Sequence, residues 1–154
     1  KILNLVIIIF LSFTTKSFAN DIGYKYYEKG YYDKAFEVWS KEIKQGSAEA
    51  MYNMGLLYFF GRGVERDLTI AFDYCEKAAL KGLSRAQNNL AFMYMKGMGI
   101  QKSYVNAYVW SLIAISNGYS SHGIRDDARM NLTPAMLSDA NRLIKQIKKE
   151  MQDE

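Results

Sequence analysis

The sequence predicts an all-α protein made of about three helix-turn-helix repeats, closed by a C-terminal pair of capping helices. The first observation is a 36-residue step between Gly46, Gly82 and Gly118, since 82 − 46 = 36 and 118 − 82 = 36. The second is that each full period contains two apolar stretches separated by a Gly-x-Gly turn. Internal repeats with periods of about 20 to 50 residues are typical of stacked arrays, in which each unit buries its apolar side against its neighbours.

Each full period is predicted to form two antiparallel helices. Apolar residues recur at spacings of three and four in both stretches, as expected for helices with one buried side. Gly61 and Gly97 stand where the first helix of a period ends in a tight or left-handed turn. Asp67 and Ser103 stand where the second helix needs an N-cap.

The segments on either side of the two full periods are predicted to be caps. Residues 21–46 read as an opening repeat with a shorter turn between its helices. Trp39 in this segment is expected to pack inward, with an exposed binding anchor as the alternative. Residues 119–154 lack a third Gly-x-Gly turn and are predicted to close the stack. There, Thr133 is the expected N-cap and Pro134 the first residue of the last helix.

Two sequence stretches carry a resemblance to a known family. They are GRGVERDLTIAFDYCEKAALKG and, one period later, GMGIQKSYVNAYVWSLIAISNG, in which Ser103 replaces the capping Asp and Ile113-Ala114-Ile115 replaces Lys-Ala-Ala. The chain resembles the Sel-one-like repeat (SLR) family, whose members are related to tetratricopeptide repeats. The resemblance implies a right-handed α/α solenoid that binds other proteins, with repeats at about 21–46, 47–82 and 83–118 and a cap at 119–154.

Residues 1–19 are predicted to be a secretory signal peptide. Lys1 precedes an apolar run, and a small-x-small pattern ends at Ala19, so cleavage is expected between Ala19 and Asn20. The run is shorter than the roughly 20 residues that span a bilayer. An uncleaved anchor is the alternative. We therefore expect a periplasmic or secreted domain, residues 20–154, that meets the membrane only transiently through its signal peptide.

Composition argues against several functional classes. The chain has 20 basic and 16 acidic residues, and removal of Lys1 and Lys16 leaves 18 against 16. This balance gives no basic face for nucleic acid. Cys75 is the one cysteine, so no internal disulfide can form, and we interpret it as a small buried hydrophobe, with a reactive thiol or an intermolecular link as the alternative. We expect no nucleic acid, no metal and no small-molecule cofactor.

No catalytic residue is predicted. The one histidine, His122, lies near Asp126 and Asp127, and a solvated or capping role is expected for it, with a metal or acid–base role as the alternative. Asp73 and Glu76 are close in sequence, but nothing places them across a substrate cleft as glycoside hydrolysis requires. A hydrolase of cell-wall or similar substrates is therefore only a minor alternative.

The predicted partner-binding surface is formed by the first helices of the repeats, which line the concave face of such a solenoid. Alignment to tetratricopeptide positions through Gly55 and Ala91 places eight residues on its outward side: Glu49, Tyr52, Leu56, Phe59, Arg85, Asn88, Phe92 and Met95. The apolar members would form an exposed patch, which is typical of an interaction site. The alternative is that the cap or tight curvature buries part of it.

The function expected from these observations is an exported adaptor or scaffold that binds a protein or peptide partner on its concave face. The resemblance also implies an alternative, because some exported members of similar size serve as immunity proteins against toxins delivered into the periplasm. A third version is an envelope or host-interaction factor with several partners. The amphipathic last helix could also pair with a second copy of the chain.

Overall fold

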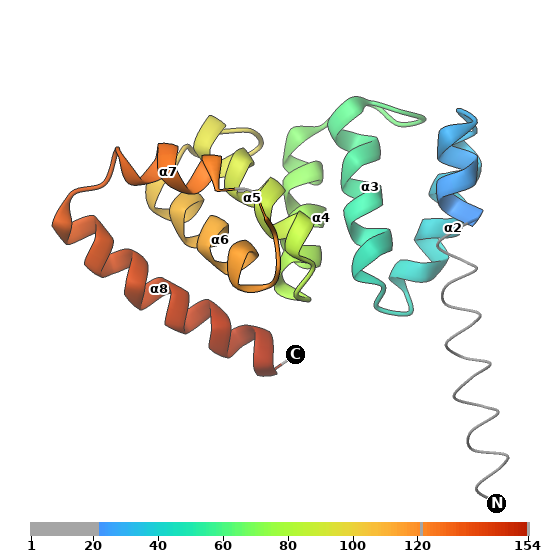
Figure 1. Ribbon diagram of the computed structural model, residues 1–154. Helices are drawn as coiled ribbons and strands as arrows, with labels where there is room; N and C mark the ends of the chain where they lie inside the picture. Colours follow the sequence, from blue (N-terminus) through green and yellow to red (C-terminus); the bar gives the residue numbers. More distant parts are fainter. Residues whose placement is uncertain (1–21, 121, 154) are drawn as a thin grey trace, which may run out of the picture.

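The computed structural model describes residues 22–120 and 122–153, so the predicted signal peptide lies outside the described part of the chain. All regular elements in these ranges are helical. A helix over residues 22–28 is followed by α2 (Tyr32–Ile43), α3 (Ala48–Phe60), α4 (Leu68–Leu80), α5 (Ser84–Lys96), α6 (Tyr104–Ser116), α7 (Gly123–Arg129) and α8 (Pro134–Asp153). Figure 1 shows these helices as a row of pairs, as predicted for an α-solenoid.

The two full repeats are the pairs α3–α4 and α5–α6, and their turns are built alike. Gly61 and Gly97 end the first helices with φ of 65° and 70°, in the left-handed region that glycine adopts without a Cβ clash. The Asp67 carboxylate accepts hydrogen bonds from the Thr69 and Ile70 amides, and the Ser103 hydroxyl caps α6 in the same place. The predicted turns and caps are therefore confirmed.

The second glycine of each Gly-x-Gly turn packs against the preceding helix pair. A Cβ on Gly99 would lie 2.0 Å from the carbonyl oxygen of Leu68, and one on Gly63 would lie 2.7 Å from the Tyr32 Cβ. Both residues also have positive φ, 73° and 71°. These positions need glycine because the turn of one repeat touches the start of the second helix of the repeat before it.

Small residues allow the helices to approach closely. Ala35, Ala71 and Ala107, which are 36 residues apart, are all buried. Hydrogen bonds of Gln87 join the start of α5 to the ends of α4 and α6. The Gln87 amide nitrogen donates to the Ala79 carbonyl at 2.9 Å, and the Asn117 amide donates to the Gln87 side-chain oxygen at 3.0 Å. Because Gln87 is fully buried, these bonds offset the cost of removing its amide from water.

The opening segment packs through aromatic side chains. Trp39 is 1% exposed, so the expectation that it packs inward is confirmed. Its ring lies 5.8 Å from that of Tyr27, and Gly23 leaves space for it, since a Cβ there would lie 2.3 Å from the indole nitrogen. Aromatic pairs at such separations add to the stabilisation from burial.

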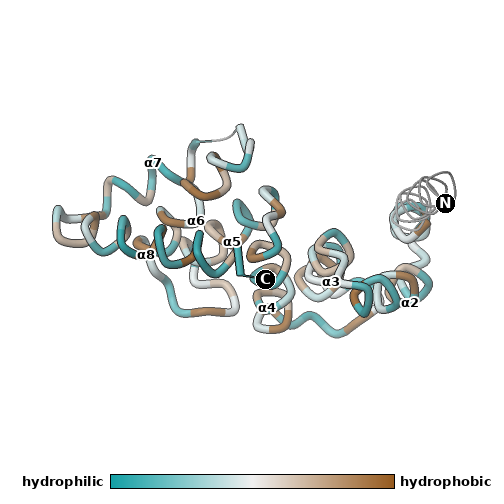
Figure 2. Tube along the Cα trace, turned by 90° about the horizontal axis from the view of Figure 1, so that it is seen from below, coloured by the Kyte–Doolittle hydropathy of each residue, from teal (hydrophilic) through white to brown (hydrophobic). Residues whose placement is uncertain are grey.

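The chain is closed by α7 and α8. Pro134 begins α8, and the Thr133 hydroxyl accepts a hydrogen bond from the Met136 amide at 3.3 Å, as predicted for a cap. Ala140 and Ile147 are buried against the main core. After α7, which contacts α6 and α5, helix α8 turns back along α6 and reaches α4. Both views place its end near α4, and Figure 2 shows a largely hydrophilic helix with apolar positions on one side (Figures 1 and 2).

Candidate functional site

The candidate site lies between α3 and α5, the first helices of the two full repeats, with α4 behind them. Contacts of α4 with both helices hold the three together. Gly55 permits the close approach of α3 and α4, because a Cβ there would lie only 3.2 Å from the Ala71 carbonyl oxygen. The Ser47 hydroxyl caps α3, whereas α5 starts without a side-chain cap. The site therefore rests on packed helices.

A hollow of about 190 Å³ opens between these helices. It is lined by Tyr52, Gly55, Leu56, Phe59, Phe60, Ala71, Cys75, Asn89, Phe92 and Met93. We call it the α3–α5 cavity. Its lining is apolar except for the Tyr52 hydroxyl, the Asn89 amide and the Cys75 thiol. A mostly apolar hollow with a few polar groups is the usual composition of a binding pocket.

Four of the eight predicted residues line the α3–α5 cavity: Tyr52, Leu56, Phe59 and Phe92. They are half-buried and do not form the open strip expected from the sequence. Their side chains cover the space between two helices, with Ala71 and Cys75 of α4 below them. Phe60, which the sequence interpretation did not select, is 51% exposed at the edge of the cavity and packs edge-on against Phe59 at 5.1 Å.

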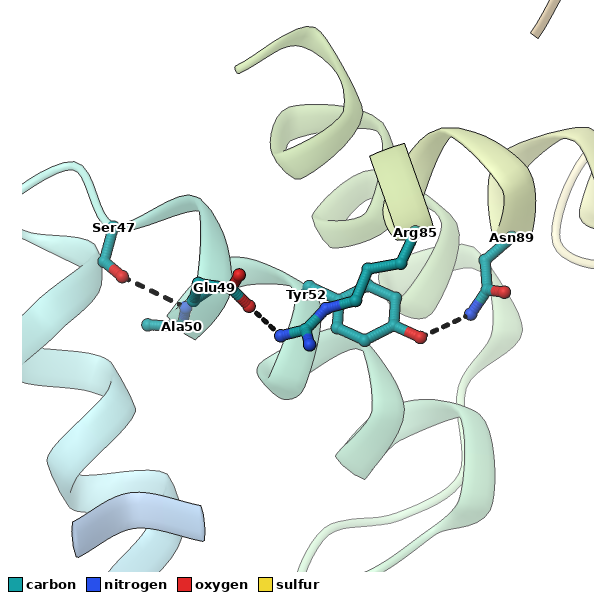
Figure 3. A network of polar contacts seen from close by, with 6 residues as sticks. All are labelled: Ser47, Glu49, Ala50, Tyr52, Arg85 and Asn89. Carbon is teal, nitrogen blue, oxygen red and sulfur yellow. Dashed lines mark hydrogen bonds and ion pairs between the residues drawn. The ribbon is translucent and has the colours of Figure 1, made fainter. Parts of the chain in front are cut away.

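A polar network borders the cavity on one side (Figure 3). The Arg85 guanidinium forms an ion pair with Glu49 and lies 4.8 Å from the centroid of the Tyr52 ring. The Asn89 amide donates a hydrogen bond to the Tyr52 hydroxyl at 2.9 Å. Three of the predicted residues, Glu49, Tyr52 and Arg85, thus meet across the two repeats. Burial raises the pKa of Tyr52 and lowers that of Arg85.

The remaining two predicted residues lie elsewhere on α5. Met95 lines a separate hollow of about 310 Å³ with Lys96, Lys102, Tyr104, Asp127, Met130 and Asn131. Asn88 is half-buried and is not among the lining residues of either hollow. Glu49 lines a third hollow, of about 580 Å³, with the ends of α4 and α8. The helical face predicted as one strip is therefore divided among separate hollows.

Sequence reasoning missed the contribution of Asn89. Its position matches Asn53 one period earlier, since 89 − 53 = 36, and repeat signatures of this kind are usually assigned to packing. Asn53 is buried, whereas the Asn89 amide reaches Tyr52 of the neighbouring repeat. The sequence does contain a phenol in the first helix of one repeat and an amide in the first helix of the next. Linking the two residues required knowledge of the register between α3 and α5.

Cys75 forms part of the floor of the α3–α5 cavity and is 5% exposed, as expected for a small buried hydrophobe. Its sulfur lies 3.3 Å from the Ala86 carbonyl oxygen, which accepts the thiol hydrogen. Burial raises the pKa of the thiol to about 12, so the reactive thiolate is scarce at neutral pH. The structure therefore favours the packing interpretation of Cys75 over the reactive one.

His122 lies exposed at the start of α7, and the carboxylate of Asp126 pairs with Arg125 at 2.7 Å. Among residues 22–120 and 122–153, the structure brings together no group of three or more His, Cys, Asp and Glu side chains suited to a metal ion. Within the same ranges, no helix has the length and apolar character needed to cross a membrane.

The family model of the Sel1 repeat matches residues 48–83 and 84–119. The chain contains two Sel1 repeats. The matched segments correspond to α3–α4 and α5–α6, so the α3–α5 cavity lies between two adjacent Sel1 repeats. Sel1 repeats are the same as the Sel-one-like repeats that the sequence resembles. Proteins that contain them are generally protein-interaction scaffolds.

Two solved structures resemble the chain. A protective antigen present in uropathogenic Escherichia coli strains, which displays an SLR fold, is 28% identical over 86% of this chain, with a TM-score of 0.73. A Sel1 repeat protein from Oxalobacter formigenes is 32% identical over 71%, with a TM-score of 0.61. This chain covers 30% and 43% of those two chains. Comparison with curated proteins gave no match.

Proposed function

We propose that this protein is an exported adaptor that binds a protein or peptide partner on the concave face formed by α3 and α5. The α3–α5 cavity is the observation that carries the proposal. Its apolar lining comes from two successive repeats and includes the aromatic side chains of Tyr52 and Phe92. Aromatic side chains are frequent among the few residues that contribute most of the binding energy in protein interfaces.

The polar network supports the same role. Glu49, Arg85, Tyr52 and Asn89 hold one another in place beside the cavity, so their orientation is set before a partner arrives. Preorganised groups lose less side-chain entropy on binding, which favours affinity. A partner would therefore meet a fixed polar border next to an apolar hollow.

Site-specific photocrosslinking tests the proposal. The photoreactive residue p-benzoylphenylalanine would replace Leu56 in the cavity and, as the control, Asn141, which is exposed on α8. Irradiation of cells that naturally produce the protein should give crosslinked products at Leu56 and not at Asn141. Equal crosslinking at both positions, or crosslinking at Asn141 alone, would contradict the proposed face.

Mass spectrometry of the crosslinked product would also identify the biological role. A single toxin bound in equimolar amount would make the protein an immunity protein, whereas several envelope components would make it a scaffold. Binding of the purified partner would then be measured by calorimetry with the wild type and with Phe92→Ala. A loss of about 2 kcal/mol or more is expected if Phe92 is a principal contact.

Export forms the second part of the proposal and rests on the pattern of residues 1–19. Cell fractionation followed by N-terminal sequencing tests it. The expected product is found outside the cytoplasm and begins at Asn20. A protein that retains Lys1 in the membrane fraction would instead be anchored by its apolar run.

A further inference from the structure

Cations gather on the aromatic side chains that line the α3–α5 cavity. Besides Arg85 on Tyr52, the Arg62 guanidinium lies 5.0 Å from the Phe60 centroid. Lys96 lines the separate hollow that contains Met95, and its ammonium lies 6.0 Å from the Phe92 centroid. A fourth cation, Arg66, donates from its Nε to the Phe59 carbonyl at 3.0 Å. Four of the lining residues thus each contact a basic side chain, Tyr52, Phe60 and Phe92 through their rings and Phe59 through its backbone carbonyl. Such cation–aromatic contacts hold the charges near the cavity.

Carboxylates balance this positive charge only in part. Glu49 pairs with Arg85, and the Asp67 carboxylate is committed to the amides at the start of α4. Glu65 is exposed in the turn beside Arg66 and, within the described residues, forms no ion pair. The basic and acidic residues of the chain without its predicted signal peptide nearly balance, 18 against 16. The four cations against Glu49, Asp67 and Glu65 leave an excess of one positive charge, and Glu76 is a further carboxylate, close enough to Cys75 that, after burial, it also raises the pKa of the thiol. What distinguishes the cavity is therefore the availability of its cations, not their number.

These four cations differ in how many of their N–H donors already have partners within the protein. Arg62 is held within the protein, because it donates to the Tyr27 hydroxyl and lies over the Tyr27 ring. Arg66 and Lys96 are exposed and form no ion pair within residues 22–120 and 122–153. Arg85 has five N–H donors, of which Glu49 engages one nitrogen. Three cations therefore remain able to bind further carboxylates.

The size of the cavity limits what can enter it. A volume of about 190 Å³ is close to that of an apolar protein cavity of about 150 Å³ known to take one benzene molecule. The α3–α5 cavity can thus hold one large apolar side chain, such as that of Leu, Met or Phe.

We propose that the occupant is an acidic segment of a partner protein, which inserts one large apolar side chain into the α3–α5 cavity and places Asp or Glu side chains beside Arg85, Arg66 and Lys96. This inference rests on the proposed function and names the chemistry of the partner. Charge complementarity of this kind speeds association and selects against basic segments.

Selection from a phage-displayed library of random peptides tests the inference. The purified protein is the bait, and a variant carrying Leu56→Ala and Phe92→Ala identifies the binders that depend on the cavity. The expected cavity-dependent peptides share one large apolar residue flanked by Asp and Glu. A synthetic peptide from this pool would then be measured by fluorescence polarisation against two charge variants.

The first charge variant, Arg66→Gln with Lys96→Gln, removes two cations beside the cavity. Two exposed ion pairs of about 0.5 kcal/mol each correspond to a loss of roughly fivefold in affinity. The matched control, Lys41→Gln with Lys145→Gln, removes the same charge from exposed positions on α2 and α8. It should leave the affinity unchanged apart from weak long-range screening effects.

The outcomes separate the two proposals. Cavity-dependent peptides without an excess of Asp and Glu, or equal affinities for both charge variants, would overturn the acidic-segment inference and leave the proposed binding face intact. A selection that yields no cavity-dependent peptide would overturn both. Circular dichroism of every variant verifies that the repeats remain folded.

Discussion

Glu49 and Arg85 occupy equivalent positions in successive repeats, since 85 − 49 = 36, and their side chains form an ion pair across the two repeats. In a stacked array, equivalent positions face one another along the same surface. Two like charges at these positions would repel each other. The opposite charges found here favour the observed alignment of α3 with α5 beside the α3–α5 cavity.

This ion pair should contribute a small but measurable coupling to stability. Glu49→Gln, Arg85→Gln and the double variant, unfolded in urea, form a double-mutant cycle. We expect a coupling of about 0.5 kcal/mol that falls with added salt, because both side chains are partly exposed. The more exposed Arg142–Asp139 pair on α8 is the control. A larger coupling there would contradict the role assigned to the inter-repeat pair.

Replacement of Gly99 should be far more harmful than replacement of Gly118, although both have positive φ. Gly118→Ala places its Cβ in open space and should cost about 1 kcal/mol for the left-handed backbone. Gly99→Ala adds the clash with the Leu68 carbonyl, which raises the expected loss to about 3 kcal/mol or more. Chemical denaturation measures both. Equal losses would show that the turn does not press on α4.

Cys75 should react slowly with a thiol reagent while the protein is folded. With a pKa of about 12, roughly one thiol in 10,000 is ionised at pH 8, and the sulfur is also shielded from solvent. Reaction with Ellman's reagent should become fast only in denaturant, where the pKa returns to about 8.5. Because the chain has no other cysteine, Cys75→Ala provides the blank. Equally fast reaction of the folded protein would contradict the burial.

Glu42 should make the stability fall as pH rises above the acidic range. Its carboxylate is buried, has no hydrogen-bond partner among the described residues, and has its pKa raised by desolvation. Below the unfolded pKa of about 4.3, both states are protonated and burial carries no ionisation penalty. As pH rises through the higher folded pKa, the unfolded state releases its proton more readily, so stability is lost.

Glu42→Gln tests this dependence, because the amide has nearly the same shape and does not ionise. Thermal unfolding at pH 4 and pH 7 should show that the variant gains stability relative to the wild type at pH 7. At pH 4 the two proteins should differ less. Glu37→Gln, an exposed change on the same helix, is the control. Parallel behaviour of wild type and Glu42→Gln at the two pH values would exclude Glu42 as the cause.

Much of the fold follows from short stretches of sequence. Caps such as Asp67 and Thr133 act on amides two or three residues away, and Gly97 ends α5 through its own φ. These effects depend on neighbouring residues only, so the helix boundaries and the 36-residue unit can be predicted without a tertiary structure. The apolar spacing likewise identifies the buried sides of the helices.

The site was predicted less completely. Tyr52 and Phe92 do lie at the α3–α5 cavity, whereas Met95, three residues after Phe92, lines another hollow. A helical repeat pattern places residues on a face but does not show where neighbouring helices divide that face. Asn89 could not be linked to Tyr52 for the same reason, because their contact depends on the register between α3 and α5.

The sequence by itself thus determined the repeat, its caps and its turns, because each arises from local backbone geometry and hydrogen bonding. Only the tertiary structure decided the pairing of Glu49 with Arg85, the cavity above Cys75 and the return of α8 along α6 to α4. Those features depend on the distances and angles between helices, which are set by the packing of many side chains at once.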